Sequence, residues 1–583
     1  MQAATVKRGR NFERWRMVSL RMSHTPRLVS GALALWMAGA SAALADVKMP
    51  AIFGDHMVLQ QDGKIPVWGT AEPGESVKVT VGSGAAEAKA DTDGRWRVEL
   101  AALPSSSAAT TMTITGKNSI TYQDVLIGDV WLASGQSNME YAVNGLPASG
   151  PVTAKQALER AANPQVRLFL VARQTGIFPK TDFQGKWEVC SPDTAGKFSA
   201  IAYFFGLELQ SDLKRPIGLI GSYWGGTPAQ TWTSLEALKS VPSEAGGVAQ
   251  VQKQRDAYPR DPAAQAALMA DFQAQLKSWQ TNVDIPFQAV FKKWQEEAQI
   301  ARAAGKPEPP RPNESSNHPN SPEGETFQPA ILYDGMIAPL IPYAIKGAIW
   351  YQGESNAGGW GEGYDALLEA LITDWRSRWG QGDFPFLIVG LANIDDRFPV
   401  PTDSGWAGVR DGQAKTAQKL PNTGLALALD IGAAHNIHPP DKLDVARRLV
   451  ASAKHIAYGQ DIVSSGPRFA GMTAEGDKVR LKYEDVGSGL AIGTAPWFSD
   501  DYPKPSSTEL VGYAVAGEDK KWTWARARIE GQEVVVWSDQ APKPVAVRYG
   551  WANNPEVNLY NKEGFPAVPF RTDDWPFVPP PPH

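Results

Sequence analysis

The pattern of apolar and polar residues changes twice along this chain. From Val47 to about Thr121, short alternating runs such as Ser76 to Val81 are separated by Gly, Asp and Pro turns, which is typical of β-strands with one buried face. A similar pattern returns near the carboxyl end of the chain. We therefore predict a small β-sandwich of the immunoglobulin kind at residues 46–122 and a second β-sandwich at residues 463–578.

Between these two regions, fully apolar runs alternate with amphipathic segments. Apolar strands separated by amphipathic helices predict a parallel sheet covered by helices on both faces. The predicted strands are Val125 to Ala133, Val166 to Val171, Ile217 to Tyr223, Ala344 to Tyr351, Phe384 to Gly390 and Gly424 to Asp430, and the predicted helices are Phe198 to Leu213, Tyr364 to Arg378 and Asp441 to Tyr458. We place this α/β domain at residues 123–241 and 323–462.

An Ala-, Gln- and Lys-rich stretch interrupts the alternation at residues 242–322. Helical periodicity at 262–280 and 287–304 is followed there by a Pro- and Asn-rich loop. We interpret the stretch as a helical insertion in the α/β domain, either a lid or a spacer. The Pro-rich tail at 579–583 is a poor candidate for ordered structure.

The first 45 residues have the order of a secretory signal peptide. Two groups of basic residues precede an apolar run from Leu28 to Ala45, which ends in Ala-Leu-Ala. An uncleaved membrane anchor is the alternative, because a run of about 18 residues is near the lower limit for spanning a bilayer. Gly31 and Gly39 favour cleavage. We predict a bacterial protein that is periplasmic or secreted and has no stable membrane insertion after signal cleavage.

Charge and cysteine content exclude several classes of partner. The 583 residues include 57 Lys and Arg and 62 Asp and Glu, and the first 45 residues hold seven of the basic and one of the acidic residues, so the remainder has a net charge of −11. An acidic protein repels a phosphate backbone, which argues against nucleic acid as a partner. The single cysteine, Cys190, excludes an intrachain disulfide and a thiolate metal cluster.

Three predicted strands end in clusters of residues that could carry chemistry, at the edge where open α/β sheets bind ligands. Ser137 follows the first strand, and Gly135 lets the backbone bend so that a serine hydroxyl is exposed; a turn or helix N-cap serine is the alternative. The paired Gly225 and Gly226 after a second strand can present backbone N–H groups, or form a simple tight turn. The run Gln-Gly-Glu-Ser-Asn at 352–356 bunches polar side chains that need partners.

A serine nucleophile needs a base, and few of the seven histidines are placed to supply one. His435 and His438 come directly after the last predicted strand, from where an imidazole can reach a nucleophile at another strand end. The alternatives are a surface loop or a metal site, for which zinc would need further ligands. Only carboxylates such as Asp430 and Asp441 are close in sequence, and we predict no metal.

With these residues laid out, the chain resembles the sialate O-acetylesterases and related carbohydrate acetylesterases of the SGNH hydrolase superfamily. The resemblance rests on blocks in family order at residues 52–60, 128–139, 222–227, 350–356, 437–439 and 558–575. It implies an SGNH-hydrolase-like parallel sheet and the removal of O-acetyl groups from sugars through an acetyl-serine intermediate. The implied substrates are acetylated glycans, either sialic acids or plant hemicellulose such as xylan or xyloglucan. No cofactor is implied.

The resemblance also implies roles for individual residues. Ser137 becomes the nucleophile and the first oxyanion N–H donor, and His438 becomes the general base. The second oxyanion N–H would come from Gly225, with Gly226 as its competitor. A side-chain donor would come from Gln352 or Asn356.

The chain departs from the family pattern at the acid that orients the base. Members of the superfamily commonly carry Asp three residues before the base, where this chain has His435. The enzyme would then work either as a Ser–His dyad, with a carbonyl holding the imidazole, or with an acid from elsewhere. Asp430 and Glu354 are the two candidates for that acid.

Two other functions stay open at the level of sequence. His435 at the expected acid position favours a non-catalytic carbohydrate-binding protein with a degenerate hydrolase domain. A metal hydrolase that uses His435 and His438 is the other alternative. The 21 Trp and 15 Tyr residues fit any sugar-binding function, because aromatic faces stack on the C–H surfaces of sugars.

Overall fold

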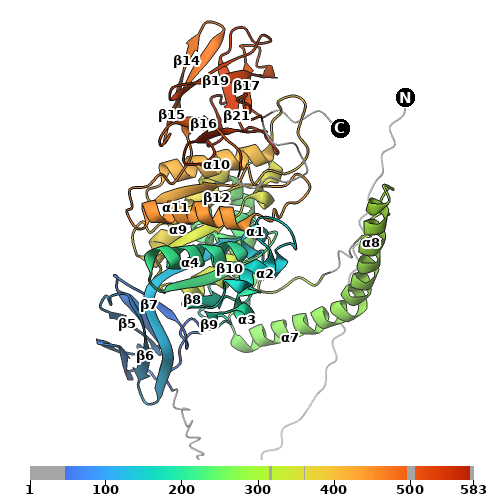
Figure 1. Ribbon diagram of the computed structural model, residues 1–583. Helices are drawn as coiled ribbons and strands as arrows, with labels where there is room; N and C mark the ends of the chain where they lie inside the picture. Colours follow the sequence, from blue (N-terminus) through green and yellow to red (C-terminus); the bar gives the residue numbers. More distant parts are fainter. Residues whose placement is uncertain (1–45, 314–317, 360, 496–505, 578–583) are drawn as a thin grey trace, which may run out of the picture. The chain divides into compact units, whose positions relative to one another are not determined.

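The computed structural model describes residues 46–313, 318–359, 361–495 and 506–577 (Figure 1). The predicted signal peptide at 1–45 and the Pro-rich tail at 579–583 lie outside these residues. No helix in the described ranges is both long enough and apolar enough to cross a bilayer.

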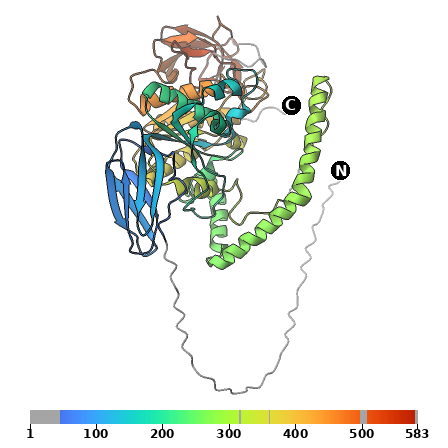
Figure 2. The ribbon, with the colours of Figure 1, turned by 60° about the horizontal axis from the view of Figure 1, so that its bottom comes forward.

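The amino-terminal part is built mainly from antiparallel strands (blue in Figure 2). Its strands are β1 (Val58–Gln60), β2 (Ile65–Thr70), β3 (Ser76–Val81), β4 (Gly84–Lys89), β5 (Arg95–Leu100), β6 (Ser106–Thr115) and the start of β7 (Ser119–Gly135). One sheet runs β4-β3-β6-β7 and β2 pairs with β5, while β1 is parallel to β7.

β7 belongs to two parts of the structure. Its first residues alternate between exposed and half-buried and pair with β6, whereas every residue from Val125 to Gly135 is buried. The predicted boundary between residues 122 and 123 therefore falls inside a continuous strand. Flanking β-sheets are present at both ends of the chain, but their division into separate sandwich domains stays a prediction.

The second half of β7 is the middle strand of the predicted parallel sheet. The other strands are β8 (Asn163–Leu170), β9 (Trp187–Cys190), β10 (Ile217–Tyr223), β11 (Gly347–Tyr351), β12 (Phe386–Gly390) and β13 (Thr423–Leu427), in the order β13-β12-β11-β7-β10-β8-β9. All neighbouring pairs are parallel except β8 with β9. The prediction of a mostly parallel sheet is confirmed.

Helices cover the sheet as its fully buried strands require. The long ones are α4 (Ala200–Leu213), α9 (Tyr364–Trp379), α10 (Gly405–Lys419) and α11 (Lys442–Ile456), and the short ones include α1 (Ser137–Glu140), α2 (Ala154–Glu159), α3 (Pro192–Ala195) and α5 (Leu235–Leu238). α11 packs beside α4, and α10 packs beside α9 (Figure 1). Both α10 and α11 also contact β12 and β13. α10 was not predicted from the sequence.

The stretch at 242–322 contains the helices α6 (Ala245–Ala257), α7 (Pro262–Trp279) and α8 (Ile285–Ala303). A π-helical turn, η4 (Gln280–Asp284), joins α7 to α8 without a break, so that they form one long helical run (green in Figure 2). Most side chains on this run are exposed. The two helical segments predicted here are confirmed.

The carboxyl-terminal part contains three antiparallel sheets. They are β14-β15-β20-β19, β18-β17-β21-β23 and β16-β22, built from β14 (Arg468–Glu475), β15 (Lys478–Glu484), β16 (Leu490–Ile492), β17 (Tyr513–Ala516), β18 (Trp522–Trp524), β19 (Arg526–Glu530), β20 (Glu533–Trp537), β21 (Ala546–Tyr549), β22 (Leu559–Asn561) and β23 (Phe570–Arg571). Their apolar core also takes in Leu427 and Leu429, from the end of β13 and the turn after it.

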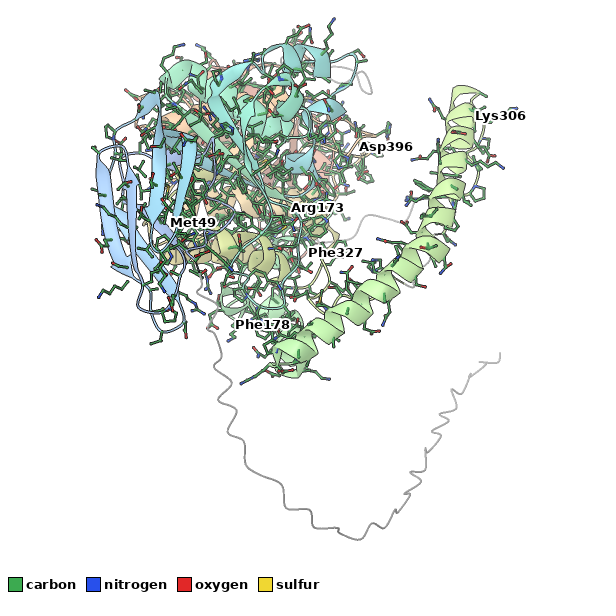
Figure 3. The ribbon with its side chains drawn as sticks, turned by 90° about the horizontal axis from the view of Figure 1, so that it is seen from below. Met49, Arg173, Phe178, Lys306, Phe327 and Asp396 are labelled. Carbon is green, nitrogen blue, oxygen red and sulfur yellow. The ribbon has the colours of Figure 1, made fainter. Side chains whose placement is uncertain are left out.

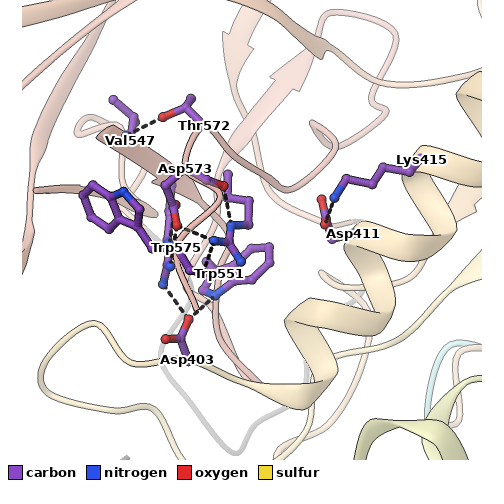
Figure 4. Close-up of polar contacts among 10 residues, drawn as sticks. Asp403, Asp411, Lys415, Val547, Trp551, Thr572, Asp573 and Trp575 are labelled. Atoms are coloured by element: carbon purple, nitrogen blue, oxygen red, sulfur yellow. Dashed lines mark hydrogen bonds and ion pairs between the residues drawn. The ribbon is translucent and has the colours of Figure 1, made fainter. Parts of the chain in front are cut away.

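A buried ion-pair network joins these sheets to the loop before α10 (Figure 4). Arg548 on β21 bonds Asp403 at 2.7 Å and both carboxylate oxygens of Asp573 at 2.9 Å. The three side chains are 5% exposed or less. The ring of Trp522 lies 4.1 Å from the Arg548 guanidinium.

Replacing Arg548 by Met should lower the free energy of unfolding by about 3 kcal/mol, because buried Asp403 and Asp573 lose the cation that they share, although Asp573 keeps its pair with Arg571. Arg526→Met is the matched control, since its pair with Asp539 is exposed, and its effect should stay within about 0.5 kcal/mol. Urea unfolding measures both variants. Equal losses of unfolding free energy in the two variants would contradict a stabilising role for the buried Arg548 pairs.

Candidate active site

The carboxyl ends of β7, β10 and β11 form the centre of the candidate site. β7 pairs with β10 on one side and with β11 on the other. The chain leaves β7 toward β8 and leaves β11 toward β12, so the connections from two neighbouring strands run in opposite directions. Such a switch point creates the crevice in which α/β sheets bind ligands.

Ser137 lies in the turn directly after β7 and is half-exposed. The preceding Gly135 has φ 137°, and an added Cβ there would lie 2.1 Å from the carbonyl oxygen of Tyr351. The N–H of Gln136 donates to the same oxygen at 2.9 Å. Only glycine allows this close approach, which turns the chain so that Ser137 begins α1. As the first residue of α1, Ser137 has an N–H without an intrahelical acceptor.

The turn after β10 lies against Ser137. A Cβ added to Gly225 would be 3.2 Å from the Ser137 Cβ. However, the Gly225 N–H, predicted as an oxyanion donor, donates to Glu140 Oε2 at 2.7 Å. Glu140 also pairs with Arg173. The N–H of Gly226 has no acceptor within the described residues.

Gln352 and Asn356, the predicted side-chain donors, belong to one buried network. Gln352 Nε2 donates to Asn356 Oδ1 at 2.7 Å and to Gln136 Oε1 at 3.1 Å, and Gln352 Oε1 accepts from Tyr364 at 2.7 Å. Asn356 Nδ2 donates to Gln230 Oε1 at 3.0 Å. Each amide nitrogen has two hydrogens. Gln352 has used both, whereas one amide hydrogen of Asn356 has no acceptor within the described residues.

Asn138 joins three loops of the site and was not singled out from the sequence. Its Nδ2 donates to Glu354 Oε1 at 2.6 Å and to the carbonyl oxygen of Ile437 at 2.9 Å. Its Oδ1 accepts from Lys442 Nζ at 2.5 Å. One side chain next to Ser137 therefore holds the loops that carry Glu354 and His438. Its position in the Gln-Ser-Asn run was the available signal.

Glu354 follows β11 in the 3₁₀-helix η7 (Glu354–Gly359). Its Oε1 accepts from Asn138, whereas its Oε2 is buried and has no hydrogen-bond partner within the described residues. Burial raises the pKa of Glu354, although the Asn138 hydrogen bond and the charge of Lys442 oppose the shift. A buried carboxylate oxygen without a partner can accept a further hydrogen bond.

His438 is half-buried, and its ring centroid lies 6.2 Å from that of Tyr141. Burial lowers the pKa of His438, and the positive charge of Lys442 lowers it further. The neutral imidazole, which is the form that accepts a proton, is therefore favoured at neutral pH. Neither the His438 ring nor Ser137 Oγ makes a hydrogen bond within the described residues, and such catalytic contacts are often long before substrate binds.

Asp430 and His435 occupy other positions. The predicted strand to Asp430 is too long, because β13 ends at Leu427 and the chain turns there. Both Asp430 oxygens bond Arg448, at 2.6 and 2.7 Å, and Tyr560 donates to Oδ2 at 2.8 Å. None of the Asp430 hydrogen bonds within the described residues involves His438. His435 is exposed, with its Nε2 3.9 Å from Asp396.

No group of three or more His, Cys, Asp or Glu side chains in the described parts of the chain is arranged to hold a metal ion.

Aromatic and cationic side chains lie near the turn after β10, and two of them, Arg173 and Phe327, are labelled in Figure 3. Phe327 is 64% exposed, and its ring lies 4.0 Å from where a Cβ on Gly226 would be. The Arg173 guanidinium lies 5.2 Å from the ring centroid of Trp224. Arg173 also lines a cavity of about 400 Å³ together with Glu140 and Lys197.

Comparison with known families gives a match to a family model described as "Carbohydrate esterase, sialic acid-specific acetylesterase" over residues 326–445. The mouse sialate O-acetylesterase is 29% identical over 454 residues, which are 71% of this chain and 74% of the mouse protein. The human sialate O-acetylesterase is 29% identical over 456 residues, or 71% and 72% of the two chains.

A solved structure is similar over almost the whole chain. It is the crystal structure of a novel carbohydrate acetylesterase from Xanthomonas citri, which is 31% identical in sequence. The likeness covers 91% of this chain and 100% of the other, with a TM-score of 0.69.

Proposed function

Because the chain belongs to the carbohydrate acetylesterase family that includes the sialate O-acetylesterases, we propose that it is a serine esterase that removes O-acetyl groups from sugars through an acetyl-serine intermediate. The observation that carries the serine mechanism is the position of Ser137. It begins α1 at the switch point of the parallel sheet, and its neighbour Asn138 bonds the loop of His438. An SGNH-like arrangement of nucleophile, base and oxyanion donors belongs to the same proposal.

In the proposed first half-reaction, Ser137 Oγ attacks the carbonyl carbon of the acetyl group while His438 accepts the hydroxyl proton. The carbonyl oxygen becomes an oxyanion and then reforms the carbonyl as the bond to the sugar oxygen breaks. His438 returns its proton to that sugar oxygen. In the second half-reaction, His438 takes a proton from water, the resulting hydroxide attacks the acetyl-serine, and acetate leaves as Ser137 regains its proton.

We propose the Ser137 N–H, one glycine N–H and Asn356 Nδ2 as donors to the oxyanion. Gly226 is favoured over Gly225, because the Gly225 N–H serves only after the Glu140 carboxylate has moved away from it. Asn356 is favoured over Gln352, because Gln352 has no amide hydrogen left. Each such donor is worth about 10²–10³ in rate in a serine hydrolase.

We propose Glu354 rather than Asp430 as the acid that orients His438. Glu354 Oε2 is buried and lacks a partner within the described residues. Its Oε1 is tied through Asn138 to the peptide carbonyl just before His438. Asp430 instead neutralises Arg448.

The substrate proposal covers acetylated sialic acids and acetylated hemicellulose such as xylan or xyloglucan. The exposed Phe327 ring offers a stacking surface to any sugar. Arg173 and Lys197 in the neighbouring cavity would favour a sugar that carries a carboxylate, such as a sialic acid. Export through the predicted signal peptide is part of the same proposal, since such glycans are met outside the cell.

Ser137→Ala and His438→Ala should each lower acetate release by about 10⁴-fold or more. The assay compares acetylated sialic acid, acetylated xylooligosaccharides and 4-nitrophenyl acetate. Ser488→Ala and His455→Ala are the matched controls, because both residues are outside the site. Since the pKa of His438 is lowered, kcat/KM in the wild type should fall only on the acid side of neutral pH, where His438 takes up a proton. Full activity of the Ser137→Ala variant would contradict the serine mechanism.

Glu354→Gln and Asp430→Asn should separate the two candidate acids. Glu354→Gln removes the charge that holds the imidazolium, so kcat should fall by up to about 10⁴-fold with little loss of stability. Asp430→Asn leaves the buried Arg448 charge without its counter-ion and should cost about 3–5 kcal/mol of unfolding free energy. The Asp430→Asn protein that remains folded should keep the wild-type kcat. The reverse result would favour Asp430 as the acid.

Phe327→Ala should raise KM for acetylated oligosaccharides about 10-fold, because a stacking contact worth about 1.4 kcal/mol is lost. The kinetics of 4-nitrophenyl acetate should not change, since that ester carries no sugar. Phe178→Ala is the control, as Phe178 is also exposed (42%) and is labelled with Phe327 in Figure 3. An equal loss on both kinds of substrate would contradict a sugar-stacking role.

A further inference from the structure

Lys442 is a buried lysine for which the proposed mechanism has no use. It is the first residue of α11, and only 1% of its surface is exposed. An ammonium group taken out of water costs several kcal/mol unless nearby groups compensate for its charge. Lysine is almost never fully buried without a partner.

The Lys442 ammonium makes one hydrogen bond within the described residues. Nζ donates to Asn138 Oδ1 at 2.5 Å. The ring centroids of Tyr141 and Tyr351 lie 4.8 and 6.0 Å from Nζ, at distances typical of cation–π contacts. No carboxylate in the described ranges forms a salt bridge with Lys442. The ammonium is therefore aimed at an amide oxygen.

This contact determines which way the Asn138 amide faces. With Oδ1 on Lys442, Nδ2 points to Glu354 and to the Ile437 carbonyl, and all three contacts are favourable. A flipped amide would place Nδ2 against the ammonium and Oδ1 against two other oxygens. All three contacts would then be repulsive.

We propose that Lys442 is a positioning residue, whose ammonium fixes the Asn138 amide so that it holds the Glu354 and His438 loops against Ser137. This inference rests on the proposed serine mechanism. Lys442 acts through Asn138 and does not touch the substrate. The buried Lys442–Asn138 pair thus connects the three loops through a single amide.

Three titratable groups on neighbouring elements bear on this pair. Glu354 on η7 and Asp441 before α11 favour the charged Lys442, while burial opposes it and lowers the Lys442 pKa to about 7. His438 is the titrating group that the Lys442 charge affects in turn, since that charge lowers the His438 pKa. Below pH 7 the Lys442 ammonium is mainly charged. Because His438 titrates in this pH range, the Lys442 charge acts on it there.

Lys442→Met is the first variant, because Met keeps an unbranched side chain only one heavy atom shorter and removes both the charge and the donor. Its kcat on an acetylated sugar should fall about 100-fold, as a misplacement of about 1 Å can do, with KM little changed. The acid limb of kcat/KM should move to higher pH, because His438 loses a charge that lowers its pKa. Lys454→Met is the control on the same helix, since Lys454 pairs with Asp212 at the surface.

Asn138→Asp is the second variant. It has nearly the same shape, but a carboxylate oxygen replaces the amide nitrogen that faces Glu354 and Ile437. We expect a similar loss of kcat in folded protein, whose thermal unfolding is measured in parallel. The inference is overturned if either variant keeps wild-type kcat, if the Lys442→Met profile does not shift, or if the loss of activity only follows the loss of folded protein.

The wild-type protein separates this inference from the proposed function. Acetate release that depends on Ser137 establishes the mechanism on which the inference rests. If wild type releases no acetate from any of the substrates, the proposed function fails, and the positioning role fails with it. If wild type and Lys454→Met are active and Lys442→Met matches them, only the role of Lys442 fails.

Discussion

The close approach of Gly135 to the carbonyl of Tyr351 is the constraint on which the candidate site depends. It brings the ends of β7 and β11 together with no side chain between them. The turn that follows can then bury Gln136, whose Oε1 accepts from Gln352 and from the backbone N–H groups of Gly353 and Ser355. Ser137 is thereby presented at the surface of a rigid buried network. Rigid support of this kind keeps a nucleophile in a reactive geometry before the substrate arrives.

Much of the fold could be predicted because its strands are apolar on both faces. Because parallel strands end at the same edge of a sheet, the predicted strand ends also put Ser137, Glu354 and His438 at one edge. α10 was missed because its buried face combines small residues and Val409 with the polar side chains of Arg410 and Gln413, so its hydrophobic periodicity is weak. These polar side chains bond loop and strand carbonyls, as when Arg410 bonds those of Leu391 and Ala552. The periodicity of apolar residues cannot detect a helix that packs through such polar contacts.

The roles of single polar residues depended on partners far away in sequence. Asp430 and Glu354 looked equivalent, but the turn after β13 directs Asp430 to Arg448 and to Tyr560, which is 130 residues further on. Asn138 and Lys442 are 304 residues apart. The carboxyl-terminal part also supports the site at a distance, since Asn554 bonds Asn393, which accepts from Gly432 in the loop before His438. Only the folded chain reveals these pairs.

The continuity of β7 also limits how this architecture can be rearranged. One strand supplies an edge of the amino-terminal sheet and the middle of the parallel sheet. A cut inside Ser119–Gly135 would therefore break the strand that both sheets share. Unlike a domain joined by a linker, the amino-terminal sheet shares a strand with the parallel sheet, so recombination that replaced it would have to keep β7 intact.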